Sequence, residues 1–387
     1  MIREVFILDA NTKVEMAESD RKNITIHQLL EKSAQSALNI QREDGSFPAG
    51  RNYTYDEPET PVRTTSHWAV TLSEVYKITG EDIFQKAANA AIDYLLSDEV
   101  RPYGYTFHCR DATDKDQCNG VVGQGGPIRA LSYAGPILGR KDAIETAIEV
   151  FALHPFNPDL GLWERVEING KKLSFDRTLN HQVLFAAAGS KLASESDLVN
   201  DRVEAFLNNL ETNMRLHSDG LIKHYVRPPP IDVIQKVLYT PRHYEMIINE
   251  LVYHYYSRSD ERRKKERGYH TVNLSALSRI KRSFGEHSIW ESNTIKRSLK
   301  FLLINKEELI TKIDTKHGSG LPGVATAKTL YWLGNRSSEE LCELVSIDVS
   351  KNLDRESYLL YSDGSNQHNQ AARISLLVDF PNIQLSL

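Results

Sequence analysis

Residues 174–193, SFDRTLNHQVLFAAAGSKLA, join a polar run to an apolar run that is rich in alanine. The first turn of a helix has unpaired N–H groups, and side chains there can converge on a ligand. We therefore expect this segment to be a closely packed helix with a site at its beginning. The alternative for this segment alone is a capped helix whose first turn is only solvated. The polar run contains Asp176, Arg177, Asn180, His181 and Gln182.

Similar polar groups occur near the beginnings of several other predicted helices. Capping explains Ser, Asp and Asn at such positions, but it does not explain repeated His, Arg, Tyr and Trp. We therefore predict a central site that these helix beginnings share, rather than unrelated polar loops. The residues predicted to bind substrate are His67, Trp68, Arg110, Asn119, Gln124, Trp163, Arg165, Asn180, His224, Arg242, His243 and His368.

Paired carboxyl groups would indicate glycoside hydrolysis, in which one acts as acid and the other as base or nucleophile. Trp68, Trp163 and Tyr225 would stack on sugar rings or belong to the core. The residues predicted to be catalytic are His181, Asp176, Tyr244 and Glu245. Carboxyl candidates are plentiful, so they do not select one mechanism: Glu59, Asp116, Glu164, Asp176, Asp363 and Glu245.

A second chemistry is proton abstraction beside the carboxylate of a uronate sugar. Toroidal polysaccharide lyases hold that carboxylate with Asn and a cation and use His or Tyr as base and acid, a set that Asn180, His181, Arg242 and Tyr244 resemble. Neutralising the carboxylate makes the neighbouring proton more acidic. The same groups with protonation from the opposite face would give a C5-epimerase. The leading expectation is a carbohydrate-active enzyme that cleaves or modifies a glycan by glycoside hydrolase-like acid–base catalysis in the central cavity. The uronate lyase or C5-epimerase is the first alternative, and a non-catalytic glycan-binding scaffold in polysaccharide biosynthesis is the second.

Other classes lack their motifs. The sequence contains no DxDD or DDxxD acid cluster, no GxxxxGK[ST] loop, no GxGxxG after a strand and no HExxH pair. Terpene cyclisation, nucleotide binding and zinc hydrolysis are therefore not expected. We predict no metal and no cofactor.

Composition and charge describe a globular chain. Its 387 residues are 40% hydrophobic, enough for a substantial core, and the net charge of -5 gives no general attraction to nucleic acid. We find neither a signal peptide nor a run of about 20 apolar residues. We therefore expect a cytoplasmic protein without a membrane span. Three cysteines argue against a disulfide framework, and we expect Cys109 and Cys118 to be free thiols.

Glycine-containing turns divide the chain into units. Gly45, Gly104, Gly161 and Gly220 are separated by 59, 57 and 59 residues, and DGSNQ at 363–367 has the same character. Such a period holds two helices and two connections, so each unit is a helical hairpin. Periodicity and capping signals predict twelve helices: Thr25–Gln41, Val62–Thr79, Glu81–Leu96, Gly120–Leu138, Lys141–Leu153, Arg177–Ser194, Asp197–Arg215, Pro241–Tyr256, His287–Leu303, Pro322–Leu333, Ser338–Ser350 and Asn366–Val378.

These helices predict an all-α fold, an (α/α)6 toroid (six-hairpin barrel) in which the first and last helices close the ring. A small β-hairpin is expected in a loop, with 162–168 against 171–175 across Asn169-Gly170. We predict one domain over residues 1–387, with an N-terminal extension at 1–24. The charged segment DERRKKERG places an exposed insertion at 257–286.

Several motifs carry a resemblance to known proteins. QREDGSFPAGRNYTYDEPETPVRTTSHWAVTLSEVYKITG looks like the DGSF/W turn units of α/α-toroid proteins, the group holding six-hairpin glycosidases and terpenoid cyclases. CNGVVGQGGPIRALSYAG, LHPFNPDLGLWERVEINGKKLSFDRTLNHQVLFAAAG and DGLIKHY together resemble the AglQ/VpsJ-type proteins of surface-polysaccharide gene clusters, over roughly 41–226. The resemblance implies an (α/α)6 fold, an oligosaccharide or polysaccharide substrate, and other polysaccharide-assembly proteins as partners. It supplies no established catalytic residues.

Overall fold

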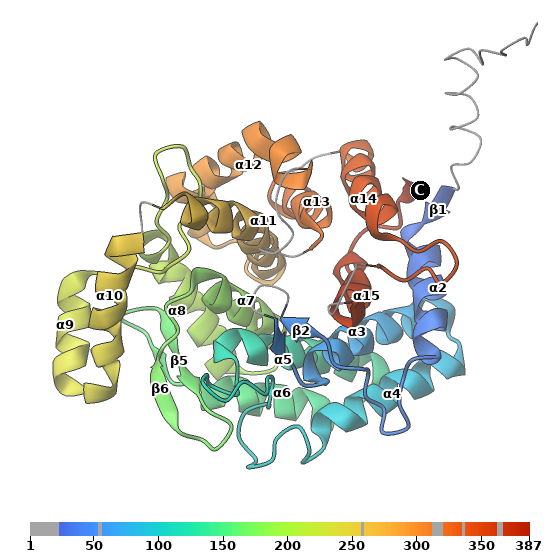
Figure 1. Cartoon of the computed structure of the whole chain (residues 1–387), viewed down its shortest axis with the longest axis horizontal. Helices are drawn as coiled ribbons and strands as arrows, with labels where there is room; N and C mark the ends of the chain where they lie inside the picture. Colours follow the sequence, from blue (N-terminus) through green and yellow to red (C-terminus); the bar gives the residue numbers. More distant parts are fainter. Residues whose placement is uncertain (1–22, 53–55, 257–258, 312–319, 335–336, 362–366) are drawn as a thin grey trace, which may run out of the picture.

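The computed structural model describes residues 23–52, 56–256, 259–311, 320–334, 337–361 and 367–387 (Figure 1). The predicted N-terminal extension, 1–24, lies outside these residues except for its last two positions. Asp363, a candidate carboxyl group, and most of the DGSNQ turn also lie outside them.

An inner ring of helices surrounds the centre of the molecule (Figure 1). Each helix contacts the next in chain order, and the last contacts the first, which closes the ring. The inner helices are α3 (Val62–Thr79), α5 (Gly120–Leu138), α7 (Leu179–Gly189, continued by the 3-10 helix Ser190–Leu192), α11 (Asp260–Ser283), α13 (Pro322–Leu333) and α15 (Gln367–Ala372, continued by the 3-10 helix Arg373–Leu377).

An outer layer of helices covers this ring, each packed on an inner neighbour. The outer helices are α2 (Ile26–Leu38), α4 (Asp82–Leu96), α6 (Lys141–Leu153), α8 (Asp197–Asn213), α12 (Asn293–Thr311) and α14 (Ser338–Asn352). The alternation of inner and outer helices confirms the predicted all-α (α/α)6 toroid.

Sequence pattern decides which layer a helix joins. Helix α7 is buried around most of its circumference, as Val183, Phe185 and Ala187 illustrate, because neighbours cover both of its flanks. Outer helix α2 is amphipathic, with Leu29 and Leu30 inside and Glu31 outside. Its capping box on Thr25 fixes where it begins.

The periodic glycines mark one structural device that recurs around the ring. Gly45, Gly161 and Gly220 all have positive φ, of 84°, 62° and 99°. A Cβ on each would overlap an outer helix, at Ala90 of α4, Asn209 of α8 and Arg297 of α12 respectively. Only glycine combines this backbone conformation with so close an approach. Three of the four periodic glycines therefore mark turns that pack against outer helices, whereas a Cβ at Gly104, which also has positive φ, would meet nothing within 4 Å.

Short strands complete the fold. Strand β1 (Asn23–Thr25) pairs with β7 (Gln384–Ser386), so the two ends of the described chain meet. The predicted hairpin is confirmed as β5 (Leu162–Val166) and β6 (Lys172–Phe175), joined by β4 (Phe156–Asn157) in one antiparallel sheet. A further pair links β2 (Arg51–Asn52) and β3 (Glu57–Pro58).

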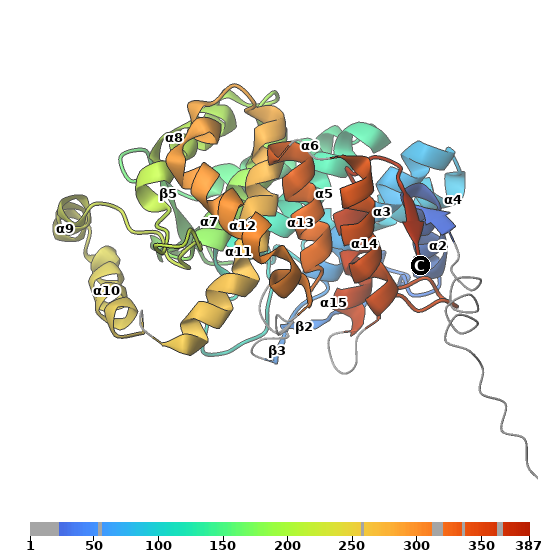
Figure 2. The same ribbon diagram turned by 90° about the horizontal axis from the view of Figure 1, so that it is seen from above.

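The prediction of an exposed insertion is wrong. The segment 257–286, expected to be an exposed insertion, contains inner helix α11, in which Leu274, Leu277 and Ile280 are fully buried. The segment that projects outside the ring is instead α9 (Pro230–Tyr239), a 3-10 helix (Pro241–Tyr244) and α10 (Glu245–Tyr256), as Figures 1 and 2 show. The first two turns of α11 consist of charged residues, so the segment has the composition of an exposed one although the residues that follow are buried.

Candidate active site

Asp176 and His181 form a hydrogen-bonded pair where β6 leads into α7. The imidazole Nδ1 of His181 lies 2.8 Å from Oδ2 of Asp176. The same Oδ2 accepts the Val121 N–H of α5 at 3.2 Å, and Oδ1 accepts the Thr178 N–H at 3.2 Å. Burial opposes ionisation of Asp176, but His181, Arg165 and these N–H groups together hold its pKa below the usual value. The carboxylate therefore stays charged and orients the imidazole.

Gly120 makes room for this pair at the beginning of α5. Its φ is 60°, and a Cβ there would overlap Oδ2 of Asp176. Asn119 before it also has a positive φ, of 56°, so the chain turns sharply into the helix. This turn directs the first two N–H groups of α5 at two carboxylates, because Gly120 donates to Asp116 and Val121 donates to Asp176.

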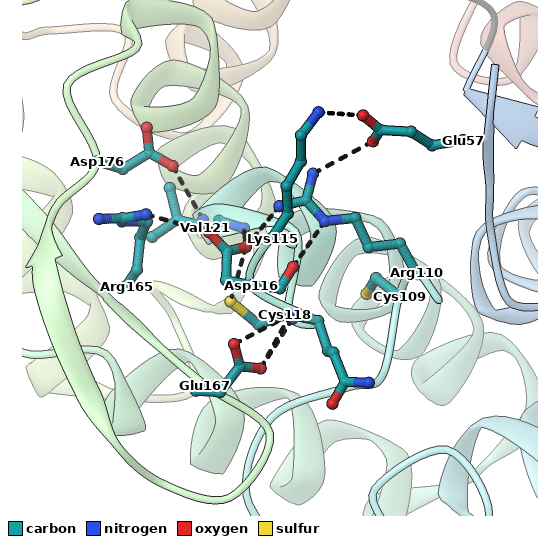
Figure 3. Close-up of polar contacts among 12 residues, drawn as sticks. Glu57, Cys109, Arg110, Lys115, Asp116, Cys118, Val121, Arg165, Glu167 and Asp176 are labelled. Atoms are coloured by element: carbon teal, nitrogen blue, oxygen red, sulfur yellow. Dashed lines mark hydrogen bonds and ion pairs between the residues drawn. The ribbon is translucent and has the colours of Figure 1, made fainter. Parts of the chain in front are cut away.

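Beside the pair, Asp116 lies between two guanidinium groups (Figure 3). Its Oδ1 is 3.1 Å from Arg110, and its Oδ2 is 3.1 Å from Arg165. Arg110 and Lys115 also bind Glu57 of β3. The network ties the 110–120 loop to the strands on either side of it and fixes the direction of Arg165.

The centre of the ring is strongly basic. His67, on the second turn of α3, has its Nδ1 2.6 Å from the Ser375 hydroxyl. Burial, followed by the charges of Arg129, Arg63, Arg373 and Arg279, lowers the pKa of His67 well below its ordinary value. Burial and the neighbouring cations therefore favour the neutral imidazole and make it a weak base.

Glu59 is the acidic member of this central group. Arg63 Nη1 lies 2.5 Å from Oε1 of Glu59, and Asn369 Nδ2 donates to Oε2 at 2.8 Å. The carboxylate thus joins the beginning of α3 to α15 across the closure of the ring.

A second cluster lies on the other face of the sheet. Arg242 binds Glu164 at 2.7 Å, and His243 stacks on Phe175 and lies 3.4 Å from Glu164. Successive side chains of a strand point to opposite faces. Glu164 and Arg165, neighbours on β5, accordingly contact different sets of residues.

The remaining predicted catalytic residues lie near the projecting segment. Glu245 binds Arg165 at 2.7 Å, so it reaches the network around Asp116. Tyr244 is 56% exposed. Among the contacts of the described residues, none joins Arg242 or Tyr244 to Asn180 or His181, so the four-residue lyase-like set is not assembled as one group.

Three predicted substrate-binding residues are core residues instead. Trp68 is 1% exposed and stacks on Phe47, and Trp163 is completely buried among the aromatic rings around Phe185. Gln124 is also completely buried, where its amide bonds both backbone groups of Phe107. No sugar can reach these side chains, so the expectation of ligand contact is wrong for all three.

The other predicted binding residues lie in several environments. Asn180 is 5% exposed, and its Oδ1 has no hydrogen-bond partner within the described structure. His224 is buried beside the rings of Tyr225 and Tyr269. His368 on α15 is half-buried, and burial together with Arg42 lowers its pKa.

Arg279 and Tyr269 are central residues that the sequence analysis missed. Both lie on α11 and close to the central group: the charge of Arg279 lowers the pKa of His67, and Tyr269 lies near enough to Arg63 and Arg373 to affect their pKa values. A signal existed in the apolar spacing of Leu274, Leu277 and Ile280. The charged run that precedes them indicates a solvent-exposed segment instead.

The described residues contain no group of three His, Cys, Asp or Glu side chains arranged to hold a metal ion. In the same part of the chain, no helix is long and apolar enough to cross a membrane. Cys109 and Cys118 are free, buried thiols, and burial raises the pKa of both.

Comparison with known proteins supports this fold. No family model matches the chain. D-mannose isomerase has a similar structure, with a TM-score of 0.62 at 14% identity, covering 92% of this chain and 97% of that one. A sugar epimerase from a ruminal bacterium gives 0.59 at 12%, covering 96% and 99%. An unsaturated glucuronyl hydrolase specific for heparin gives 0.57 at 12%, covering 90% and 96%.

A sequence relative is much nearer. Archaeal glycosylation protein Q of Haloferax volcanii is 36% identical over 357 residues, covering 90% of this chain and 96% of that protein. Identity at this level over nearly the whole of both chains extends the resemblance found in the sequence motifs. The chain therefore belongs to the family of archaeal glycosylation protein Q and has the six-hairpin (α/α)6 toroid fold.

Proposed function

We propose that this protein is an enzyme that modifies a sugar by acid–base proton transfer at the beginning of inner helix α7. His181 is the group that moves the proton, and Asp176 orients it. The observation that carries the proposal is the 2.8 Å hydrogen bond from Nδ1 of His181 to the buried Asp176 carboxylate. An imidazole whose Nδ1 is held in this way presents Nε2 as the acid or base.

Proton transfer is favoured over hydrolysis because three of the candidate carboxyl groups already have partners in the described structure. Asp116 lies between two arginines, Glu59 binds Arg63 and Asn369, and Glu245 binds Arg165. A hydrolase needs one carboxyl group that is protonated and able to donate. The oxygens of these three carboxyl groups already contact their partners, which leaves them poorly placed to reach the oxygen of a glycosidic bond.

Glu164 is the carboxyl group at this sheet whose pKa is raised, with burial as the cause. However, its ion-pair partners are Arg242 and His243, and no contact of the described residues joins its side chain to Asp176 or His181. The two carboxyl groups are therefore poorly placed to attack one glycosidic bond from both sides. This arrangement supports epimerase- or isomerase-like chemistry.

The proposed substrate is a sugar or oligosaccharide used in glycan assembly. The relative is named as a glycosylation protein, and the solved structures with this fold are named as a mannose isomerase, an epimerase and a glucuronyl hydrolase. These names support a carbohydrate substrate, while the histidine pair supports the type of reaction.

The experiment is incubation of the purified protein with neutral and uronate-containing sugars in deuterated water. Nuclear magnetic resonance would follow deuterium at carbon, and parallel assays would follow new reducing ends and the ultraviolet absorbance of unsaturated uronates. The proposal expects deuterium at a carbon without chain cleavage. New reducing ends would indicate hydrolysis, rising absorbance a lyase, and no change in any assay a binding scaffold; each would contradict the proposal.

A further inference from the structure

Three guanidinium groups at the centre of the ring have no carboxylate partner among the described residues. Arg129 donates to the Ser375 carbonyl oxygen at 3.1 Å, and Arg373 donates to the Gln370 side chain at 2.8 Å. Arg279 forms no ion pair within the described part of the chain. They come from α5, α15 and α11, and all three charges act on His67.

Other basic residues of the inner ring are neutralised or bonded elsewhere. Arg63 binds Glu59 at 2.5 Å, and Arg282 binds Asp379 at 2.8 Å. Lys191 lies 3.9 Å from Asp379, and Lys328 donates to the Val378 carbonyl oxygen at 2.9 Å. Asp379 also acts on Arg129 and Arg279, and Glu59 on Arg373, but only from beyond ion-pair distance, and each acid is already bound to other cations. The described side chains leave an excess of positive charge around His67.

This excess costs free energy unless something compensates for it. Burial and the charge of Arg129 lower the pKa of Arg279 to about 9. Burial and the charge of Arg63 lower the pKa of Arg373 to about 10. Both groups still carry their charge at neutral pH. Like charges held together in a desolvated position are retained where a ligand of opposite charge binds.

The surroundings of the arginines match an anionic sugar better than a simple ion. His67 is neutral and lies beside them, and Ser375 links its ring to Arg129 through a hydroxyl and a carbonyl group. Hydroxyl, imidazole and amide groups suit the hydroxyl groups of a sugar ring, whereas guanidinium groups suit a carboxylate or a phosphate.

We propose that Arg129, Arg279 and Arg373 form an anion-binding subsite that receives the carboxylate or phosphate of an acidic sugar substrate. This inference rests on the proposed function, because it concerns the substrate that the proposed enzyme would bind within the same ring. If the anionic group binds at the centre, the rest of a longer sugar could extend towards His181 at the beginning of α7. It would also make neutral sugars poor ligands.

The test is isothermal titration calorimetry of the full chain with D-glucuronate, inorganic phosphate and D-glucose. At least one anion should bind about tenfold or more tightly than glucose, as expected for charge-assisted hydrogen bonds. Glucuronate binding without phosphate binding identifies a carboxylate site, and the reverse identifies a phosphate site. Equal binding of all three probes, or binding of glucose alone, would overturn the inference.

Variants localise the site. Arg279→Met should weaken anion binding about tenfold, and Arg279→Lys should restore part of it. Arg297→Met is the control, because Arg297 lies on outer helix α12, where it donates to the backbone carbonyl groups of His217 and Ser218. Unchanged anion affinity in Arg279→Met, or equal loss in Arg297→Met, would contradict the assignment.

A measurement on the unmodified protein guards against variants that fail to fold. Rising salt should weaken anion binding and leave glucose binding nearly unchanged, because salt screens the charges. Salt-independent anion binding would contradict the subsite. Binding and turnover also separate the two proposals: anion binding through Arg279 without turnover would leave the subsite standing, whereas turnover of neutral sugars without anion preference would leave only the proposed chemistry.

Discussion

His181 and Asp176 are joined by a 2.8 Å hydrogen bond across the turn from β6 into α7. The carboxylate is 5% exposed and also receives an N–H group of α5, so its position is set by two inner helices. The His181 side chain is 28% exposed and can therefore meet a ligand. A rigid acceptor behind a reachable imidazole is the arrangement that general acid–base catalysis needs.

Replacing Asp176 with Asn should lower turnover by about 10²-fold or more, because the amide cannot stabilise a charged imidazole. The variant should fold, since Asn keeps a side-chain oxygen for the Val121 N–H. Steady-state kinetics and a thermal unfolding curve measure the two effects.

A matched control for this variant is Glu266→Gln. Glu266 lies 2.7 Å from His217 in a second buried carboxylate–histidine pair, on α11 and a turn of the chain. The Glu266→Gln variant should lose no more than about twofold in turnover, a far smaller loss than the one expected when acid–base catalysis is removed. Equal loss in both variants would show that the effect is structural rather than chemical.

Gly45→Ala should destabilise the fold more than Gly104→Ala. Both glycines have positive φ, 84° and 72°, so both substitutions strain the backbone by about 1 kcal/mol. Only at Gly45 would the new Cβ overlap the Ala90 carbonyl group, whereas nothing lies within 4 Å at Gly104. Denaturant unfolding of the two variants gives the comparison, and equal losses would refute the packing role assigned to the periodic turns.

Trp163→Ala should reduce the free energy of unfolding by about 3–5 kcal/mol, the range for a buried aromatic residue. Its ring packs against Phe151, Phe156, Phe185 and Phe206. Tyr103→Ala, at a side chain 61% exposed, is the control and should change stability little. A stable Trp163→Ala protein that has lost sugar binding would restore the stacking role that burial excludes.

Asp348 should make stability depend on pH. Burial raises its pKa to about 7, above the unfolded value near 3.8, although N–H groups at the beginning of α13 oppose the shift. The folded protein therefore binds the proton more tightly than the unfolded chain. The stabilising contribution of protonated Asp348 to the free energy of unfolding is present below about pH 4 and is lost as the pH rises to about 7.

The measurement is unfolding by denaturant at several pH values for the unmodified protein and Asp348→Asn. The difference in unfolding free energy between them should shift by a few kcal/mol, at about 1.4 kcal/mol for each pKa unit. Asn keeps an acceptor for the Val324 N–H, which Asp348 binds at 2.8 Å. A difference that is constant across this pH range would contradict the raised pKa.

The fold was largely predictable because its signals are local. The glycines at 45, 161 and 220 fix turns against outer helices, and helix periodicity is visible over a few turns. Inner helix α11 is not predicted because its first two turns are charged, and the apolar residues that are buried come only after them. Exposure could not be read from that composition.

The site was only partly predictable for a different reason. His181 and Asp176 are five positions apart, so their contact is local. The central arginines come from helices distant in the sequence, and only closure of the ring brings their charges together. Residue type alone also failed to separate buried Trp163 and Gln124 from ligand-facing residues, since aromatic and amide groups serve both roles.

The most direct test of the account compares deuterium incorporation into a sugar by the unmodified protein, His181→Ala and His27→Ala. His27 lies on outer helix α2, far along the chain from the pair, and serves as a control for removal of an imidazole. The account predicts incorporation at a carbon by the unmodified protein and by His27→Ala, and its loss in a folded His181→Ala protein. Incorporation that continues undiminished in His181→Ala would contradict the account.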